Sequence, residues 1–393
     1  MKKRAVNASQ TPLYREAGFR LQDAATTKSA FEEEASHPHE PRHYIYSRYR
    51  NPTVVAVEKQ IMELEGSEWA LLTETGMAAI DVAVSIFQRG ADTRPWLFFN
   101  EIYGGTHSFI DKVLIPRRGL DIHRYYANGD RYDLARLEEM IERIRPEFLY
   151  FEAVSNPMLI VADVRAIMEL AAKHQVKTIV DNTFGTPYLW KPLEDGATVV
   201  IHSVTKYLSG HGNITAGVVC GNDPGLLREA IEYRKWAGHF LSPDDAHRLG
   251  DQIKTFELRF SRHCANALEI AGFLNSHPLL EKVLYPGLPQ HPTYPEARSL
   301  FKEKGFGGMI TFDLKGDSPE HKRARCEVFV AALEEKIPLV PTLGEVDSIL
   351  VPIEAVWGTK YPEPGMIRLS VGIVPAEHSI EWLENALKAA YRA

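Results

Sequence analysis

A lysine follows one of the apolar stretches of the chain, within residues 199–213 (VVIHSVTKYLSGHGN). The run 199–201 is typical of a buried strand, which would deliver Ser203, Thr205 and Lys206 to its carboxyl end. Burial disfavours an ammonium group and lowers the pKa of a lysine, so that the amine becomes available to attack a carbonyl carbon. The segment therefore indicates a Schiff-base lysine, although a surface lysine at the end of a strand explains this segment alone equally well.

A second apolar run, 178–180, ends in Asp181. A carboxylate at the tip of a buried strand needs a cationic partner or several hydrogen-bond donors. The ring nitrogen of pyridoxal 5'-phosphate (PLP) is one such cation, and PLP enzymes pair it with an aspartate. Taken alone, Asp181 is better explained as the aspartate of a turn or a helix cap.

Two further strand ends carry glycines. After the run 69–72, Gly76 and Met77 open an apolar helix, where free backbone N–H groups attract anions and a missing side chain lets a phosphate approach. After the run 96–99, Tyr103 precedes two glycines, and its ring is suited either to stack on a flat heterocycle or to pack before a tight turn. Together the four strand ends supply an anion site, a stacking ring, a carboxylate and an amine, which is the set that PLP requires.

The elements that must position these groups alternate along the chain. Helical patterns over 134–144 and 164–171 lie between the apolar runs, with Asp133 and Asp163 as N-caps. Strands that alternate with helices predict an α/β fold with a large, mostly parallel sheet, and ligands bind outside the carboxyl ends of such strands. After residue 240 the pattern changes to a helix over 244–274, a loop (GLPQHPTYPEA), a strand (GGMITFDL) and a closing helix over 380–388.

We therefore predict an N-terminal arm in residues 1–55, a PLP-binding α/β domain in 56–240 and a smaller C-terminal α+β domain in 241–393. The chain begins without the apolar core of a signal peptide, and no run of about 18 apolar residues occurs, so we expect a cytoplasmic protein with no membrane partner.

Composition narrows the classes of partner. The 393 residues include 45 basic and 52 acidic side chains, with a net charge of −7 and no dense Lys/Arg cluster, so nucleic-acid binding is not expected. Three widely spaced cysteines predict neither a disulfide framework nor a zinc site. No metal is expected either at the histidines of the polar arm, His37, His39 and His43.

Several segments match the motifs of a known family. They are YSRYRNPT (46–53), TGMAA (75–79), YGGT (103–106), DNT (181–183), HSVTKYLSGHG (202–212), RHCANA (262–267) and RLSVG (368–372). Through these motifs nearly the whole chain resembles the Cys/Met-metabolism (trans-sulfuration) family of PLP-dependent enzymes. That family includes cystathionine γ-synthase, cystathionine γ-lyase, methionine γ-lyase and the O-acylhomoserine sulfhydrylases, and the resemblance implies the fold type I architecture.

The resemblance also implies a role for each motif residue. Lys206 would hold PLP and move the proton between Cα and Cγ of the substrate, Asp181 would hold the ring nitrogen, and Tyr103 would stack on the ring and act as an acid or base near the leaving group. The cofactor phosphate would bind Gly76, Met77, Ser203 and Thr205, together with Tyr46 and Arg48 of the neighbouring subunit. The amino-acid substrate would meet Arg368, through its α-carboxylate, and Asn156 and Thr342. A shared site makes a dimer the smallest active unit, and the family is usually a homotetramer.

Departures from the family pattern bear on the substrate. Members that handle cystathionine carry an arginine two positions beyond YGGT, where this chain has Ser108. Pro341 and Thr342 replace an acidic residue and a serine, and LVPIEAVWGTKYPEPG (350–365) stands where the family has a threonine-histidine pair. A small or neutral γ-substituent therefore fits better than a zwitterionic one.

These features predict γ-elimination of the methionine γ-lyase type, which yields a 2-oxo acid, ammonia and the leaving group. The alternative is a transferase reaction, γ-replacement on an O-acylhomoserine, of the sulfhydrylase or cystathionine γ-synthase type. A non-catalytic binding or scaffold protein is a remote alternative, because such a protein would be expected to lack Lys206 or Asp181, and both are present.

Overall fold

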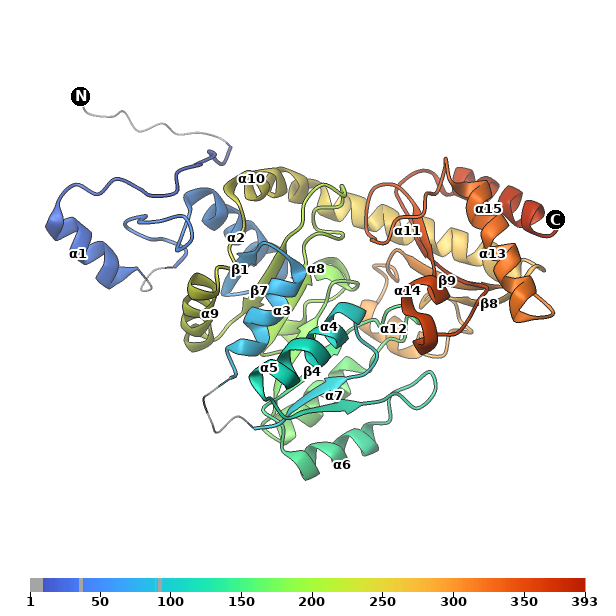
Figure 1. Cartoon of the computed structure of the whole chain (residues 1–393), viewed down its shortest axis with the longest axis horizontal. Helices are drawn as coiled ribbons and strands as arrows, with labels where there is room; N and C mark the ends of the chain where they lie inside the picture. The colour runs from blue at the N-terminus through green and yellow to red at the C-terminus, as the bar shows by residue number, and fades with distance from the viewer. Residues whose placement is uncertain (1–9, 35–37, 89, 91–93, 393) are drawn as a thin grey trace.

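Two sheets of different size organise the chain, and a long helix runs between them (Figure 1). The computed structural model describes residues 10–34, 38–88, 90 and 94–392. The segment that holds α1 (Ala24–Glu33) lies away from the large sheet at one end of the molecule, and the small sheet lies at the other end (Figure 1).

The large sheet is built from the apolar runs 69–72, 96–99, 178–180 and 199–201, from two further runs that the sequence predicts as strands, 148–151 and 217–219, and from β3 at one edge. Its strand order is β1-β7-β6-β5-β4-β2-β3, and β7 is antiparallel to both β1 and β6 while the pairs from β6 to β3 are parallel. The prediction of a mostly parallel sheet is confirmed. The strands are β1 (Trp69–Thr73), β2 (Trp96–Phe99), β3 (Ile122–Tyr125), β4 (Phe148–Glu152), β5 (Lys177–Asp181), β6 (Val199–Ser203) and β7 (Gly217–Gly221).

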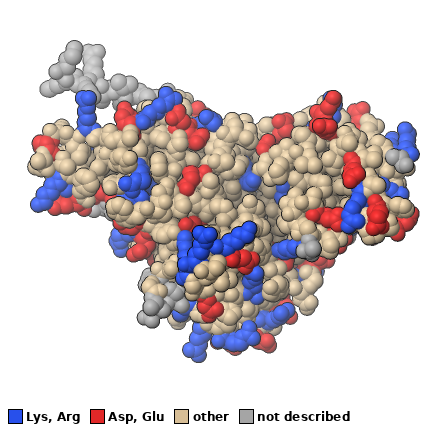
Figure 2. Space-filling model, viewed as in Figure 1, with Lys and Arg blue, Asp and Glu red and all other residues tan. Residues whose placement is uncertain are grey.

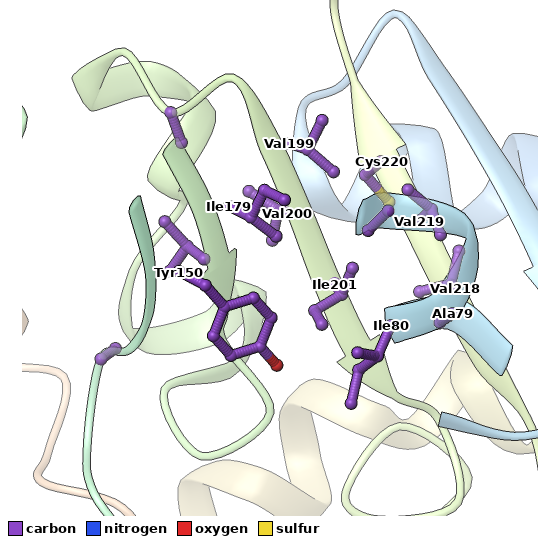
Figure 3. Close-up of a cluster of buried hydrophobic side chains, with 14 of the residues drawn as sticks. Ala79, Ile80, Tyr150, Ile179, Val199, Val200, Ile201, Val218, Val219 and Cys220 are labelled. Carbon is purple, nitrogen blue, oxygen red and sulfur yellow. The ribbon is translucent and has the colours of Figure 1, made fainter. Parts of the chain in front are cut away.

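Helices pack against this sheet because its central strands are apolar on both faces. Ala79 and Ile80 of α3 lie against Ile201 and Val218 of the sheet (Figure 3). The helices of this part are α2 (Pro52–Glu65), α3 (Gly76–Ser85), α4 (Gly104–Phe109), which continues through a π-helical turn (Ile110–Leu114) into α5 (Ile115–Arg118), α6 (Leu134–Ile144), α7 (Val164–Lys173), α8 (Thr186–Leu189) and α9 (Pro224–Ala237).

The predicted N-caps are confirmed. The carboxylate of Asp133 accepts from Arg136 N at 3.1 Å, and that of Asp163 accepts from Ala166 N at 3.2 Å. Each bond satisfies one of the N–H groups that the first turn of a helix leaves without a partner.

The small sheet is antiparallel, in the order β10-β11-β9-β8, and has its own hydrophobic core. Its strands are β8 (Leu280–Leu284), β9 (Met309–Leu314), β10 (Ile349–Pro352) and β11 (Met366–Ser370). The helices of this half are α10 (Pro243–Gln252), α11 (Phe256–Ser276), α12 (Tyr294–Phe301), α13 (Pro319–Leu333), α14 (Ile353–Trp357) and α15 (Ala376–Ala390). The first half of α11 packs in the core of the large sheet and its second half in the core of the small one.

The predicted single helix over 244–274 is wrong, because a 3₁₀ turn (Ile253–Thr255) separates α10 from α11. The carbonyl of Gln252 accepts from the Thr255 hydroxyl at 3.1 Å and from the Arg259 guanidinium at 3.0 Å. Side chains thus bind the carbonyl at the junction, which a continuous helix would pair with a backbone N–H.

Two segments expected to be irregular contain helices. The predicted loop at 287–297 holds the start of α12, where Pro295 lies in the first turn and blocks no helical hydrogen bond. The predicted arm holds α1 (Ala24–Glu33), whose N-cap Asp23 accepts from Thr26 N at 2.8 Å.

The described surface carries both charges. Lys and Arg side chains lie beside Asp and Glu side chains over most of the face shown in Figure 2. Within the described residues, no helix is both long and apolar enough to cross a bilayer. Cys220, Cys264 and Cys326 are buried free thiols. Of the arm histidines, His37 lies outside the described residues, and His39 Nε2 lies 3.0 Å from the carbonyl oxygen of Ala70.

Candidate active site

The carboxyl ends of β4, β5 and β6 and the start of α3 surround a cavity of about 240 Å³. Segment 341–343 and β11 close this cavity from the side of the small sheet. Of the residues predicted for the site, those that line the cavity are Gly76, Met77, Tyr103, Asn156, Asp181, Ser203, Thr205, Lys206, Thr342 and Arg368. Tyr46 and Arg48 lie elsewhere.

Lys206 lies in the turn after β6 and directs its amine towards segment 341–343. Its Nζ donates to Thr342 Oγ1 at 2.7 Å. Burial lowers the pKa of Lys206 to about 8, the positive charge of Arg368 lowers it further, and Glu345 opposes both effects. A useful fraction of the amine is therefore unprotonated near neutral pH, as nucleophilic attack requires.

A glycine allows segment 342–344 to approach the lysine so closely. Gly344 has a φ of +80°, and a Cβ at this position would stand 2.8 Å from the backbone nitrogen of Tyr207. Any other residue would therefore be both strained and in collision with the chain beside Lys206.

Asp181, at the tip of β5, is a buried carboxylate with hydrogen-bond donors but no cation. Its oxygens accept from Thr183 N at 3.0 Å, from the Thr183 hydroxyl at 2.6 Å and from the Tyr150 hydroxyl at 3.3 Å. Burial raises the pKa of Asp181, and the donated hydrogen bonds from Thr183 counteract it. No basic side chain of the described residues forms an ion pair with it, so the protonated ring nitrogen of PLP fits this carboxylate.

The start of α3 offers an anion site on the other side of the cavity. Gly76 and Met77 are in the first turn, whose N–H groups have no intrahelical acceptor, and the Thr75 hydroxyl caps Ala78 N at 3.0 Å. A Cβ on Gly76 would stand 2.8 Å from Ser203 Oγ, so the missing side chain keeps this corner open. The Thr205 hydroxyl, by contrast, already bonds to the backbone of Ala216, at 3.1 Å to O and 3.0 Å to N.

The cavity thus combines an amine, a buried carboxylate and a helix N-terminus, and these groups fit the carbonyl, ring nitrogen and phosphate of PLP. Lys206 would hold the carbonyl carbon, Asp181 the ring nitrogen, and the first turn of α3 with Ser203 the phosphate.

Tyr103 stands at the mouth of the cavity, at the end of β2 and the start of α4. Its backbone N–H donates to Glu152 Oε1 at 2.5 Å, and its side chain is 47% exposed. The ring leans over Gly105, where a Cβ would lie 2.3 Å from it. The stacking of this ring on a cofactor stays a prediction.

Arg368, on β11, is a buried cation without a counter-ion. Its Nη1 donates to Asn156 Oδ1 at 3.1 Å and its Nη2 to the carbonyl oxygen of Thr342 at 2.9 Å. Burial lowers the pKa of Arg368 to about 10, which leaves the group charged at neutral pH. Since no described carboxylate pairs with it, a carboxylate entering the cavity would find a free guanidinium.

Tyr46 and Arg48 form a separate aromatic and cationic cluster. Arg48 Nη1 donates to the carbonyl oxygen of Lys235 at 2.7 Å, and its guanidinium lies 5.5, 5.1 and 5.8 Å from the ring centres of Tyr46, Tyr49 and Trp236. Within one chain these residues do not reach the cavity, and their expected role in a neighbouring subunit stays a prediction.

Thr183 and Tyr150 lay outside the predicted set, whereas Glu152 belongs to the segment (EAVSNP) that the family resemblance places beside the cofactor. Thr183 and Tyr150 donate to Asp181, and Glu152 accepts from the backbone of Tyr103. Burial raises the pKa of Glu152 well above its usual value. The pattern held a signal for two of them, because Tyr150 and Glu152 occupy alternate positions near the end of a strand and so face the same side.

Comparison with known proteins agrees with this geometry. A family model described as Cys/Met metabolism PLP-dependent enzyme matches residues 1–388. The chain is 36% identical over 392 residues to L-methionine gamma-lyase of Pseudomonas putida (96% of this chain, 92% of that protein). It is 35% identical over 360 residues to cystathionine beta-lyase of Lactococcus lactis (89% and 90%). The structure of cystathionine gamma synthase from Xanthomonas oryzae pv. oryzae, in complex with cystathionine, matches with a TM-score of 0.85 at 28% identity (98% and 94%). The chain therefore belongs to the Cys/Met-metabolism family of PLP-dependent enzymes, with the fold type I architecture.

Proposed function

We propose that the protein catalyses γ-elimination on an L-amino acid with a small, uncharged γ-substituent, with methionine as the first candidate. The observation that carries this proposal is the charge inventory of the cavity. Among the described residues that line it, Lys206 and Arg368 are the only cationic ones. One amine is needed for the cofactor and one guanidinium for the α-carboxylate, which leaves no lining cation for a second carboxylate at the far end of a substrate.

Four of the lining residues have a part in this reaction. When bound, PLP supplies an electron sink for charge that develops at the substrate carbons. Arg368 holds the α-carboxylate, and Asn156 holds Arg368 in place. Lys206, with a lowered pKa, takes the proton from Cα, loss of a Cβ proton then expels the γ-substituent, and Lys206 returns a proton at Cγ. Tyr103 stands at the mouth, where its phenol can exchange a proton with the departing thiol.

The cofactor contacts follow from the same geometry. Asp181 keeps the ring nitrogen protonated, while Gly76, Met77, Ser203 and Thr205 surround the phosphate. For Thr205 this contact requires its hydroxyl to share or release the bonds to Ala216 described above.

The assembly is part of the proposal. Residues 1–55 would form an arm that brings Tyr46 and Arg48 to the phosphate in the neighbouring subunit, residues 56–240 the cofactor domain and residues 241–393 the C-terminal domain. The exposure of Tyr46 (42%) and Trp236 (66%) in the single chain supports burial of this cluster by a second copy. The expected assembly is a homotetramer built from two such dimers.

The second candidate is γ-replacement on an O-acylhomoserine. It is favoured by the match over nearly the full chain to a cystathionine gamma synthase structure. After the γ-substituent has left, elimination adds a proton at Cγ and water then releases the 2-oxo acid and ammonia by hydrolysis at Cα, whereas replacement adds the sulfur of a thiol at Cγ. The two reactions are therefore separated by their dependence on added thiol.

The experiment measures 2-oxobutanoate release from L-methionine and, separately, from O-acetylhomoserine, each with and without a thiol. Release from methionine without added thiol supports the γ-lyase. Reaction of O-acetylhomoserine alone, diverted by thiol into a new amino acid, rejects the lyase in favour of the replacement enzyme.

A further inference from the structure

The segment between β10 and β11 lies in the stretch where the resemblance leads us to expect a threonine-histidine pair that this chain lacks. Residues 353–361 fold into α14, a 3₁₀ turn (Gly358–Lys360) and Tyr361, and we call these residues the strap. The strap leads directly towards the strand that carries Arg368.

Two side chains fasten the strap to the segment that carries Tyr103. Lys360 Nζ donates to the carbonyl oxygen of Asn100 at 3.1 Å, and the Tyr361 hydroxyl donates to Glu101 Oε2 at 2.5 Å. Burial raises the pKa of Tyr361, and the nearby Glu101 raises it further, so the phenol stays a hydrogen-bond donor. The strap therefore has a fixed position beside the mouth of the cavity.

The fastened strap places an indole between two parts of the site. The ring centre of Trp357 lies 5.3 Å from Arg368 Cζ, within the range of a cation–π contact. On its other side, a Cβ built on Gly104 would lie 4.0 Å from Trp357 Nε1. Gly104 follows Tyr103, so the indole spans from the guanidinium to the residue next to the exposed tyrosine.

We propose that Trp357 is a specificity-determining residue, which forms an apolar wall beside Arg368 and selects amino acids with uncharged side chains. This inference rests on the proposed function, because it takes Arg368 as the group that binds the substrate α-carboxylate. Trp357 lies just behind the residues that line the cavity, and a carboxylate bound to Arg368 would bring the substrate close to its ring, whose centre is 5.3 Å from Arg368 Cζ. A thioether gains a sulfur–aromatic or apolar contact, whereas a charged distal group would lose water against an apolar ring.

The indole has a second effect on the same arginine. A ring that covers one face of the guanidinium excludes water from it and strengthens its bond to a carboxylate. Trp357 therefore has two effects on binding. It strengthens the binding of every amino acid through its contact with Arg368, and it favours uncharged side chains because its ring forms an apolar wall.

The test is a set of dissociation constants for amino acids that carry no γ-leaving group. L-Alanine, L-norleucine and L-2-aminoadipate are titrated against the holoenzyme, and binding is followed by the absorbance of the bound cofactor. In the Trp357→Ala variant we expect norleucine binding to weaken roughly tenfold, alanine binding to weaken less, and aminoadipate to gain relative to norleucine. The Trp357→Phe variant, which keeps an aromatic face, should retain most of the norleucine preference.

Two comparisons complete the test. Trp382→Phe, which changes an indole that packs on His378 of α15, should leave all three constants unchanged. If Trp357→Ala does not fold or loses PLP, the double variant Lys360→Met/Tyr361→Phe decides, because loss of both fastening hydrogen bonds should lower the ratio of norleucine to alanine affinity while the indole remains.

Equal weakening for all three ligands, or no change, would overturn the inference and leave Trp357 with a packing role. Failure of the proposed function has a different signature. If Arg368 does not bind the α-carboxylate, Arg368→Ala would leave alanine binding unchanged. If the reaction is not the proposed one, methionine would not react, even though the preference for norleucine still depends on Trp357.

Discussion

Lys206 and Thr342 are joined by a hydrogen bond of 2.7 Å, from the amine of one to the hydroxyl of the other. The lysine follows a strand of the large sheet, whereas the threonine belongs to the segment before the small sheet's β10. The carbonyl oxygen of the same threonine accepts from Arg368 at 2.9 Å. Thr342 thus sets the position of the nucleophilic amine relative to the guanidinium, and the active site depends on how the two halves of the chain pack.

Lys206→Ala tests the identity of the nucleophile. The variant should bind PLP without covalent attachment, and turnover should fall by about 100- to 10,000-fold, because it removes both the anchoring amine and the group that moves the proton. Borohydride treatment followed by peptide mass analysis should label residue 206 in the parent protein. A label at another lysine, or normal turnover by the variant, would show that the assignment is wrong.

The lowered pKa of Lys206 predicts the pH dependence of cofactor uptake. Because the unprotonated amine reacts, the rate at which apoenzyme attaches PLP should rise with pH and level off above about 8, rather than above the ordinary lysine value of 10.5. In Arg368→Gln the loss of a nearby positive charge should move this midpoint to higher pH. Lys388→Gln, at an exposed position of α15, is the matched control and should not move it. A midpoint that moves to lower pH in Arg368→Gln contradicts the electrostatic explanation.

Asp181→Asn tests whether Asp181 is needed for turnover rather than for attachment of the cofactor to Lys206. The amide is nearly the same size but cannot keep the ring nitrogen protonated, so we expect turnover to fall by about 100- to 1000-fold while covalent attachment at Lys206 persists. The measurements are the single-turnover rate and the mass of the borohydride-reduced peptide. An unchanged rate would indicate that Asp181 acts only as a turn residue.

A buried ion cluster beneath the large sheet predicts a stability effect away from the site. Glu58 Oε1 accepts from Arg234 Nη1 at 2.8 Å and from Leu72 N at 3.0 Å, and Oε2 accepts from Arg50 Nη1 at 3.4 Å. Glu58→Gln leaves two buried guanidinium groups without a counter-ion and should lower the free energy of unfolding by about 3–5 kcal/mol.

Chemical denaturation is the measurement for this cluster, with Glu63→Gln, at an exposed position of the same helix, as the control. The control should stay within about 0.5 kcal/mol of the parent protein. Equal effects of the two substitutions would mean that the cluster contributes little.

The local residue pattern was sufficient to predict those helices and strands that long apolar runs or helix N-caps mark in the sequence. The central strands are apolar on both faces, so runs such as 148–151 and 199–201 stand out in the sequence, and the aspartate caps mark the starts of α6 and α7. The strands β3 (IHRY) and β8 (LEKVL) were not predicted, because mixed polar and apolar residues on a half-covered sheet resemble loops.

The residues of the candidate site also divide into those that the sequence predicted and those that only the structure shows. Lys206, Asp181 and Gly76 lie at strand ends or a helix start, where the sequence alone gives their position, and the family motifs added Arg368. The position of Trp357 depends on contacts between segments far apart in the chain, and only the folded structure shows it. The absence of an arginine at Ser108 was visible in the sequence, but the hydrogen bonds of the strap to Asn100 and Glu101 were not.

The most direct test of the proposed function is the stoichiometry of products from L-methionine with the purified holoenzyme and no added thiol. The account predicts thiol, ammonia and 2-oxobutanoate in equal amounts at initial rate, with all three formed at least about 100-fold more slowly by the Lys206→Ala variant. Absence of all three products from methionine, with new amino acid formed only when O-acetylhomoserine and a thiol are both present, would contradict γ-elimination as the activity of this protein.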